Sequence, residues 1–285
     1  MNVDTAISEN RTVETTLNYH RYLLLPMERG GMAQIYRAKP RNRKSEELTL
    51  KILHGELIAS PRIVDRFREE YRLLKQLRHD RLPHAAGHGK LGGRPYMAYR
   101  YIKGTPALKV LKDAAKTSGT DPKTTCLIIR DLLMTLDYLH RRKRPIIHSD
   151  ISPENLLLGN QNDVYLIDFG SAQQLVDRQS MATTWIGKPS YLSPEQAQGF
   201  PWDHRSDIYQ TGVVFYELLA GKKLNQGKGK AQSRTIAANP PAPQEHFIPA
   251  PLLPVLRRML QFNPVRRFAS ARSCIHAMDQ VYPSL

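Results

Sequence analysis

The stretch HSDISPENLLL, from His148 to Leu158, holds residue types that are well suited to chemistry. Asp150 and Asn155 flank a loop braced by Pro153, directly after a long apolar-faced segment. At this spacing an acid and an amide can be aimed at one site, the acid toward a hydroxyl group and the amide oxygen toward a divalent cation. The stretch therefore predicts a loop that presents paired polar groups to one reaction centre.

Three more polar side chains extend the same chemistry. Asp168 follows the apolar run VYLI and precedes Phe169 and Gly170, where its carboxylate can reach a cation. Lys51 lies within the apolar run TLKI, where its charge needs an anion, and Glu70 is a suitable partner. An acid for a hydroxyl, oxygen ligands for divalent ions and a lysine for phosphates are the groups used in phosphoryl transfer.

The elements that must position these groups follow from the hydrophobic period. Residues 21–53 alternate apolar and polar positions, which predicts two strands joined at the glycine pair of GGMA and a third strand over ELTLKIL. Glycine lets backbone amides approach phosphate oxygens, although a glycine pair alone is usually only a turn. Residues 63–77 have helical spacing, and strands around HGKLGG and RPYMAYRYI complete a small antiparallel sheet.

Beyond Gly104 and Pro106 the period changes to that of a helix. Long apolar-faced helices are predicted over residues 126–141, 208–221 and 252–260. The stretch between the last two is rich in Lys, Gly and Pro, which predicts a weak helix within a long mobile loop. No internal repeat is present.

Taken together, these motifs resemble the eukaryotic-like (Hanks-type) Ser/Thr protein kinase family in its bacterial form. GGMAQIY resembles the Gly-rich loop, TLKI the strand of the phosphate lysine, HSDISPEN the catalytic loop, and DFG is intact. GKPSY, SPEQ and SDIY resemble the substrate-facing loop, the end of the activation segment and the start of the large-lobe central helix.

The resemblance covers about residue 20 to the end and implies an α+β, bilobal fold. The expected small lobe, about residues 20–102, is an antiparallel β-sheet with one helix, and the larger lobe, about 103–285, is mainly helical. Residues 1–19 are expected to form a flexible arm. The resemblance also implies that Glu195 and Arg267 form a buried structural ion pair, and that His148 braces the catalytic loop rather than acting as a base.

The resemblance implies an ATP-dependent serine/threonine kinase that uses Mg²⁺. Asp150 would accept the proton of the substrate hydroxyl, Asn155 and Asp168 would hold magnesium, and Lys51, paired with Glu70, would hold phosphates. The further nucleotide contacts that it implies are Gly30, Gly31, Met32 and Ala33 over the phosphates and Ile35, Tyr99, Arg100, Ile102 and Leu157 around the adenine.

Three residues depart from the family pattern around the nucleotide and in the catalytic loop. Glu28 replaces the first glycine of the Gly-rich loop, and Thr49 replaces a small alanine beside adenine, so both are expected to weaken ATP binding. Ser149 replaces the arginine that couples the catalytic loop to a phosphorylated activation segment in many relatives. A form active without such phosphorylation is therefore expected, with no switch implied at Ser180, Thr183 or Thr184.

The fourth departure is Ser152, which replaces the lysine that steadies the transferring phosphate. Without any cation there, developing charge would be partly uncompensated. In GKPSY, however, Lys188 occupies the position where Ser/Thr kinases commonly have a threonine. We therefore interpret the two residues as exchanged, with Lys188 supplying the ammonium group and Ser152 the hydroxyl. The alternative for Lys188 is an ordinary surface lysine.

The composition of the chain limits the other partners and binding sites that it could have. With 42 basic and 26 acidic residues the formal charge is +16, which favours an acidic protein substrate or partner. The basic clusters lack interleaved aromatic residues, so nucleic acid is not expected as the main partner. Only two cysteines are present, and His84 and His88 lack a clear third ligand, so no disulfide framework or zinc site is predicted.

No apolar run reaches the length of a membrane helix, and the start of the chain does not resemble a signal peptide. A cytoplasmic protein is therefore expected, with export as an effector as the alternative. The rival function is a pseudokinase scaffold that binds nucleotide or a partner without turnover. It is favoured by Glu28, Thr49 and Ser152 and opposed by the retained acid, amide and lysine residues. The oligomeric state and the substrate are not predicted.

Overall fold

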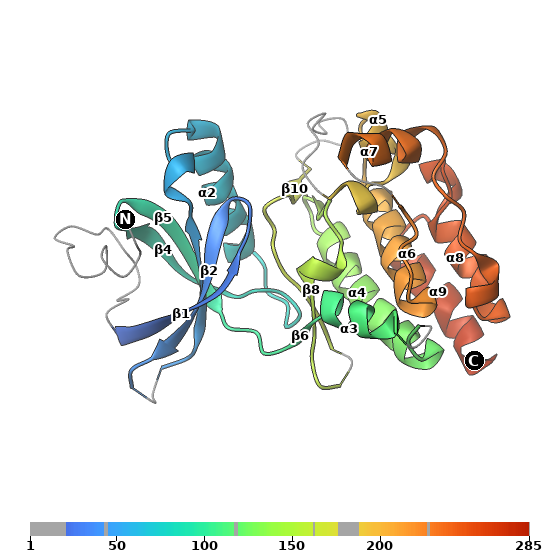
Figure 1. The fold of residues 1–285 in the computed structure, drawn as a ribbon, viewed down its shortest axis with the longest axis horizontal. Coiled ribbons are helices and arrows are strands. Elements are labelled where there is room, and N and C mark those ends of the chain that lie inside the picture. Colours follow the sequence, from blue (N-terminus) through green and yellow to red (C-terminus); the bar gives the residue numbers. More distant parts are fainter. Residues whose placement is uncertain are drawn as a thin grey trace. The chain divides into compact units, whose positions relative to one another are not determined.

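The structure, a computed structural model, describes residues 21–42, 45–116, 119–161, 163–175, 188–226 and 229–284 (Figure 1). The chain divides into two units, Met1–Lys103 and Gly104–Leu285, each of which is described by itself. The sequence predicted the division at residues 102/103. The expected arm over residues 1–19 and the side chains of Glu28, Ser180, Thr183 and Thr184 lie outside the described residues.

The first unit is an antiparallel sheet of five strands in the order β1-β2-β3-β5-β4, with one long helix, α2, at Pro61–Lys75 (Figure 1). The strands are β1 (Tyr22–Arg29), β2 (Ala33–Pro40), β3 (Leu48–Leu53), β4 (Ala85–Leu91) and β5 (Arg94–Arg100), with a short 3-10 turn, η2, at Gly55–Leu57. All five strands and the helix were predicted, although the helix begins and ends two residues earlier than expected.

The two faces of this sheet carry different sets of side chains, because successive side chains of a strand point to opposite faces. On β3, Leu48, Leu50 and Ile52 face a hydrophobic core that also contains Tyr36 and Tyr96. The intervening residues of β3 therefore point to the opposite face. The strand is buried along its whole length, which explains why a lysine within it requires a partner.

The second unit is mainly helical and also holds small sheets. Its α-helices are α3 (Ala107–Ala114), α4 (Pro122–His140), α5 (Pro194–Gln198), α6 (His204–Ala220), α7 (Gly229–Ala238), α8 (Leu253–Met259) and α9 (Ala271–Val281). Its strands are β6 (Thr105–Pro106), β7 (Ile146–Ile147), β8 (Leu156–Leu158), β9 (Val164–Leu166) and β10 (Gln173–Gln174). Single 3-10 turns are η3 (Pro153–Asn155), η4 (Pro189–Tyr191), η5 (Glu245–Phe247), η6 (Ala250–Leu252), η7 (Pro264–Arg266) and η8 (Tyr282–Ser284).

Helix α6 is the central element of this unit, and every residue from Ser206 to Ala220 is buried. The Asp203 side chain caps its start by accepting a hydrogen bond from the Arg205 amide at 2.8 Å. It ends at Gly221, whose φ of 63° and close approach to the Ala114 carbonyl leave no room for a side chain. The helices predicted over residues 126–141, 208–221 and 252–260 correspond to α4, α6 and α8.

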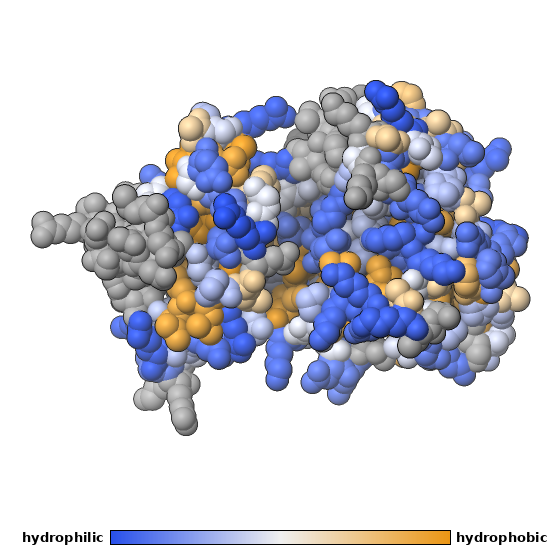
Figure 2. Space-filling view, viewed as in Figure 1, coloured by the Kyte–Doolittle hydropathy of each residue, from blue (hydrophilic) through white to orange (hydrophobic). Residues whose placement is uncertain are grey.

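The weak helix predicted in the loop after α6 is present as α7. On the face seen in Figure 2, hydrophilic side chains cover most of the described surface, and hydrophobic ones form smaller areas between them. Cys126 and Cys274 are free and buried. Among the described residues, no helix combines the length and the apolar character needed to cross a bilayer.

Candidate functional site

The glycine turn between β1 and β2 is fixed by hydrogen bonds to its backbone. The Gly30 amide donates to the Ala33 carbonyl at 3.0 Å, and the His54 amide donates to the Met32 carbonyl at 2.9 Å. The His54 ring nitrogen Nε2 contacts the Gly30 carbonyl at 2.8 Å. None of the described residues lies within 4 Å of the place where a Cβ of Gly31 would be. The space in front of this turn is therefore open to a ligand.

Lys51 and Glu70 form a buried ion pair in the first unit. The Lys51 Nζ atom lies 2.8 Å and 2.9 Å from the two carboxylate oxygens of Glu70. Both side chains are less than a tenth exposed. A buried charge pair with both oxygens engaged holds the ammonium group in one position on the sheet. The partner predicted for Lys51 is therefore confirmed.

The strand register places the residues expected around a nucleotide on one sheet face. Ile35 lies opposite Lys51, and Thr49 lies opposite Tyr99, in the antiparallel pairs that join β2, β3 and β5. By alternation, these side chains share the face opposite to the hydrophobic core. Arg100 differs, since its Nε atom pairs with the exposed carboxylate of Glu46 at 2.8 Å.

In the second unit, side chains of helix α6 hold the backbone of the loop HSDISPEN, residues 148–155. The Asp207 carboxylate accepts hydrogen bonds from the amides of His148 at 2.9 Å and Ser149 at 2.8 Å. The Gln210 side chain accepts one from the Ile151 amide at 2.9 Å. Sequence reasoning missed both anchoring residues. Their signal was present as two polar side chains, three positions apart, at the start of a helix with a long apolar run.

Burial alone would raise the pKa of Asp207, but hydrogen bonds and nearby charge outweigh it. The His140 Nε2 atom lies 2.9 Å from the carboxylate, and His148 donates its amide. The pKa of Asp207 therefore lies below its ordinary value, so the group stays ionised. The ring of His148 is buried and packs edge-on against Phe169, with centroids 4.9 Å apart. Burial lowers the pKa of His148, consistent with a bracing role.

Ser149 has a left-handed backbone, with φ at 68°, that neighbouring side chains stabilise. Its carbonyl accepts hydrogen bonds from the amide groups of Gln196 at 3.1 Å and Gln210 at 3.0 Å. Its hydroxyl accepts one from the indole of Trp202 at 3.1 Å. Trp202 also packs with Ile147 in a small hydrophobic cluster. Neutral side chains thus bind the carbonyl and hydroxyl of Ser149, while the Asp207 carboxylate binds its amide, at the position where the family resemblance implies an arginine.

Asp150 and Asn155 are directly connected, as their spacing suggested. The Asn155 side-chain amide donates to the Asp150 carbonyl at 2.8 Å and to the Asp150 carboxylate at 2.9 Å. Burial raises the pKa of the Asp150 carboxyl above its ordinary value, while the charge of Lys188 and the Asn155 hydrogen bond act in the opposite direction. The neighbouring groups thus fix the orientation of the Asp150 carboxylate and influence its pKa.

The Lys188 side chain reaches into this loop. Its Nζ atom donates to the Ser152 hydroxyl at 2.8 Å and to the Asn155 side-chain oxygen at 3.4 Å. The same atom lies 3.9 Å from the Asp150 carboxylate and 3.6 Å from the Glu154 carboxylate. The Lys188 backbone amide also donates to Asp150 at 3.3 Å. Ser152, fully buried, therefore meets the ammonium group beside the acid.

Asp168 supplies an exposed carboxylate, the type of group that binds divalent cations. Its backbone is left-handed, with φ at 61°, and its exposed carboxylate accepts a hydrogen bond from the Gly170 amide at 3.1 Å. The amide hydrogens of Asn155 point toward Asp150, and its side-chain oxygen accepts the hydrogen bond of 3.4 Å from Lys188. One carboxylate and one amide oxygen suit Mg²⁺, which takes few protein ligands and completes its shell with water and phosphate oxygens. The residues present therefore fit a magnesium ion.

Glu195 and Arg267 form the buried ion pair that the sequence suggested. Two bonds of 2.7 Å join the guanidinium to both oxygens of Glu195, and Arg267 is 2% exposed. The remaining guanidinium hydrogens reach the carbonyls of Gln261, Arg205 and Phe262. With every donor of the guanidinium engaged, this pair ties α5 to the segment before α9.

Leu157 lies in β8 and is partly buried, and Ile102 follows β5 with similar exposure. They belong to different units, so each is placed only within its own. The residues that the structure brings together in the first unit are the glycine turn, Ile35, Lys51, Glu70 and Tyr99. Those that it brings together in the second are Asp150, Ser152, Asn155 and Lys188, with Asp168 at the end of β9.

Known proteins are similar to this chain over most of its length. The protein kinase domain family matches residues 26–279. The serine/threonine-protein kinase PknB of Mycobacterium leprae is 31% identical over 253 residues, covering 85% of this chain and 40% of the relative. A probable serine/threonine-protein kinase of Clostridium perfringens is 30% identical over 273 residues, covering 92% of this chain and 38% of the relative.

The chain spans about two fifths of the length of these curated relatives. Its five-stranded sheet with one helix and its mainly helical second unit are those of the α+β protein kinase fold. The matched family covers most of the chain, and the relatives are bacterial. The chain therefore belongs to the protein kinase family, among its bacterial Hanks-type serine/threonine members.

Proposed function

We propose that this chain is a protein serine/threonine kinase that transfers the γ-phosphate of ATP, with Mg²⁺, to a protein hydroxyl. The observation that carries the proposal is the cluster of Asp150, Asn155, Ser152 and Lys188 on one loop and its neighbouring segment. It combines an oriented acid, an oxygen ligand for a metal and a cation, which are the groups that phosphoryl transfer uses.

In this proposal the first unit binds the nucleotide. Lys51, held by Glu70, contacts phosphate oxygens, and the backbone from Gly30 to Ala33 covers the phosphates. Ile35, Thr49 and Tyr99 share the sheet face of Lys51, which supports their assignment to the adenine side together with Ile102 and Leu157. Arg100 contributes through its backbone, since its side chain pairs with Glu46.

The second unit carries out the chemistry. Asp150 accepts the proton of the substrate hydroxyl, and Asn155 orients its carboxylate. Asn155 and Asp168 hold Mg²⁺, which neutralises phosphate charge when bound. The +16 formal charge favours acidic sequences around the substrate hydroxyl.

Lys188 supplies the cation that the catalytic loop lacks at Ser152, because its ammonium group already lies 3.9 Å from the Asp150 carboxylate. Lys188→Ala is expected to lower kcat by roughly 10- to 100-fold, the loss of one charge-assisted contact of about 1.5–3 kcal/mol. Steady-state kinetics measures this effect. Lys222→Ala is a matched control, since this exposed lysine lies outside the cluster. An unchanged kcat for Lys188→Ala would show that Lys188 is an ordinary surface lysine without a role in phosphoryl transfer.

The same variant has an expected pH signature. The charge of Lys188 lowers the pKa of Asp150, so its removal raises that pKa further above the ordinary value. A base works in its ionised form, so the acid limb of kcat/KM should move to higher pH in Lys188→Ala. A limb that stays in place would show that Lys188 does not act on Asp150.

Gly31→Ala tests the nucleotide role of the glycine turn. The methyl group meets nothing within 4 Å, so the protein should be at least as stable as wild type, with a gain of up to about 1 kcal/mol. A phosphate group close to the backbone would meet this methyl group, and KM for ATP should rise severalfold. Thermal melting and ATP titration distinguish the effects. A lower Tm with unchanged KM would contradict the phosphate contact.

Regulation differs from that of relatives with an arginine before the catalytic acid. The Ser149 amide donates to the Asp207 carboxylate, and its carbonyl and hydroxyl are held by the neutral side chains of Gln196, Gln210 and Trp202. The loop is thus assembled without a phosphate, and protein treated with a phosphatase is expected to keep its transfer rate. Mass spectrometry would verify dephosphorylation. Loss of the rate after complete dephosphorylation would show that phosphorylation is required.

Transfer of labelled γ-phosphate from ATP and Mg²⁺ to casein and to the protein itself tests the proposed function. Label on serine or threonine that Asp150→Asn abolishes is the expected result. Absence of label together with a Tm raised by ATP would instead identify a pseudokinase that binds nucleotide without turnover.

A further inference from the structure

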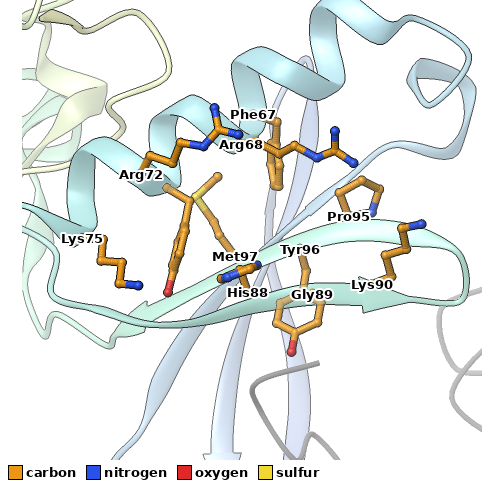
Figure 3. A pocket seen from close by; sticks show the side chains of 11 residues that line it. Phe67, Arg68, Arg72, Lys75, His88, Gly89, Lys90, Pro95, Tyr96 and Met97 are labelled. Carbon is orange, nitrogen blue, oxygen red and sulfur yellow. The ribbon is translucent and has the colours of Figure 1, made fainter. Parts of the chain in front are cut away.

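Some basic side chains of the first unit pair with carboxylates of the same helix. Figure 3 shows four basic side chains around a cavity of about 590 Å³, namely Arg68, Arg72, Lys75 and Lys90. Arg68 and Arg72 pair with acids three residues earlier on α2, at 3.2 Å and 2.9 Å, and both pairs are exposed. Exposed pairs within one helix contribute little energy, so they only support the surface of α2.

Lys223, which follows helix α6 in the second unit, has a different kind of partner. Its Nζ atom lies 3.4 Å from the carboxylate of Glu217, whose side chain has no exposed surface, whereas the Lys223 side chain is 45% exposed. The Glu217 carboxylate also accepts hydrogen bonds from the Tyr191 hydroxyl at 2.8 Å and from the Leu224 amide at 3.3 Å. The acid is therefore shielded from solvent, and the ammonium group of Lys223 is the charge that a ligand would meet.

Lys223 is also attached to residues 188–191 of GKPSY. Its ammonium group donates a hydrogen bond to the Tyr191 hydroxyl and lies 4.7 Å from the centroid of the Tyr191 ring. Lys188, at the other end of these residues, lies 3.9 Å from the Asp150 carboxylate. A peptide bound along this segment with its hydroxyl at Asp150 would therefore come close to Lys223. Because an ammonium group has three hydrogens, one remains for the peptide beside those used on Tyr191 and Glu217.

We propose that Lys223 is a specificity-determining residue that selects substrates with an acidic residue near the phosphorylated hydroxyl and disfavours basic ones. An acidic side chain would contact the ammonium group directly. A basic side chain would be repelled by it and could not reach the buried carboxylate of Glu217, because Lys223 already pairs with that carboxylate. This inference deepens the proposed kinase function and rests on it.

The test is fluorescence anisotropy of the full chain with two fluorescein-labelled peptides, Glu-Glu-Ala-Ser-Glu-Glu and Lys-Lys-Ala-Ser-Lys-Lys. The quantity compared is the Kd of the basic peptide divided by the Kd of the acidic peptide. Lys223→Gln is expected to lower this ratio at least about tenfold, because the acidic peptide loses a cationic contact and the basic peptide gains access to Glu217. Lys223→Arg, which keeps the charge, should retain the ratio within about threefold of wild type.

Lys222→Gln is the matched control, since it makes the same charge change at the neighbouring exposed position. The Lys222 ammonium group lies 4.2 Å from the centroid of the Phe247 ring, so its charge is directed away from Tyr191. This variant should keep the ratio within about twofold of wild type.

Glu217→Gln should change the ratio in the opposite direction. Glutamine keeps the shape of the side chain but removes the buried negative charge, so the ammonium group of Lys223 loses its counter-charge. The ratio should rise at least about threefold. Since Glu217 has no exposed surface, it can act on a peptide only through its neighbours. Thermal melting verifies that the variants are folded, and ratios that move in the same direction in Lys223→Gln and Glu217→Gln would contradict electrostatic selection.

Two further results would overturn the proposal. Equal changes in Lys223→Gln and Lys222→Gln would assign the preference to the overall basic charge, and a folded Lys223→Gln protein with the wild-type ratio would exclude Lys223. Peptide binding needs no turnover, so this failure is distinguishable from failure of the proposed function. Phosphorylation of casein with an unchanged ratio would refute the role of Lys223 alone, whereas a changed ratio without any transfer of phosphate would refute kinase activity alone.

Discussion

Asp150→Asn is expected to lower kcat by about 10²- to 10⁴-fold, the range that a general base contributes. Asparagine keeps the shape of the side chain but cannot take up a proton from the substrate hydroxyl. The Asp150 oxygens accept hydrogen bonds from Asn155 and from the Lys188 amide, and one of these contacts remains possible in the variant. The loss should therefore appear in kcat, with KM for ATP and Tm little changed.

Glu154→Gln is the matched control for this experiment. Glu154 is the next acid along the loop and lies 3.6 Å from the Lys188 ammonium group, but among the described residues it forms no hydrogen bond with Asp150. Its removal should leave kcat within about threefold of wild type, the effect of a long, half-buried ion pair. If Asp150→Asn retained wild-type kcat, another group would have to accept the proton.

Arg267→Met is expected to lower the free energy of unfolding by about 3–5 kcal/mol, because it leaves a buried carboxylate without its partner. Arg267 makes two bonds of 2.7 Å to Glu195 and three to backbone carbonyls. Chemical denaturation measures the loss. Arg266→Met, at the exposed neighbouring position, should change the free energy by less than about 0.5 kcal/mol.

The loss should depend on pH in a defined direction. Burial acts to raise the pKa of Glu195, but the hydrogen bonds and charge of Arg267 outweigh it, so the pKa lies below the ordinary value. Stability from the ionised carboxylate is therefore present above the pKa of the unfolded chain and is lost as pH falls through the folded pKa. The free energies of unfolding of the wild type and of Arg267→Met should therefore become similar at acidic pH. A constant difference down to that range would contradict the role of the charge.

Local sequence patterns were sufficient for the secondary structure that positions the site. Burial shapes the patterns of β3 and α2, so Lys51 stood out as a charge on an apolar strand and Glu70 as its partner on one face of an amphipathic helix. Helix ends were predicted less well. Pro61 begins α2 before the first apolar residue of the pattern, because proline suits the first helical turn.

The supports of the catalytic loop could not be predicted in the same way. Asp207 lies more than 50 residues after the His148 amide that it binds, and Trp202 lies more than 50 residues after the Ser149 hydroxyl that it binds. Contacts over such separations arise from tertiary packing. Hydrophobic periodicity predicts local secondary structure and gives no information about these contacts. The left-handed backbone of Ser149 is equally invisible, since serine has no preference for that conformation and adopts it only where neighbours stabilise it.

Lys188 shows how a resemblance can predict more than a pattern does. On its own it is one of 42 basic residues, and only its place opposite a missing lysine suggested a contact with Ser152. The 2.8 Å hydrogen bond between these side chains agrees with that interpretation. The catalytic role of the contact remains a proposal. The ion pair of Lys223 with Glu217, in contrast, had no sequence signal, because lysines are frequent in the segment after α6.

The most direct measurement is kcat for Lys188→Thr with and without Ser152→Lys. The double variant restores the arrangement usual in the family, with a lysine in the loop and a threonine opposite. If the two residues exchange one cation and one hydroxyl, Lys188→Thr alone should lose about 10- to 100-fold in kcat and Ser152→Lys should recover most of it. A double variant that melts like wild type yet is no faster than Lys188→Thr would contradict the exchange.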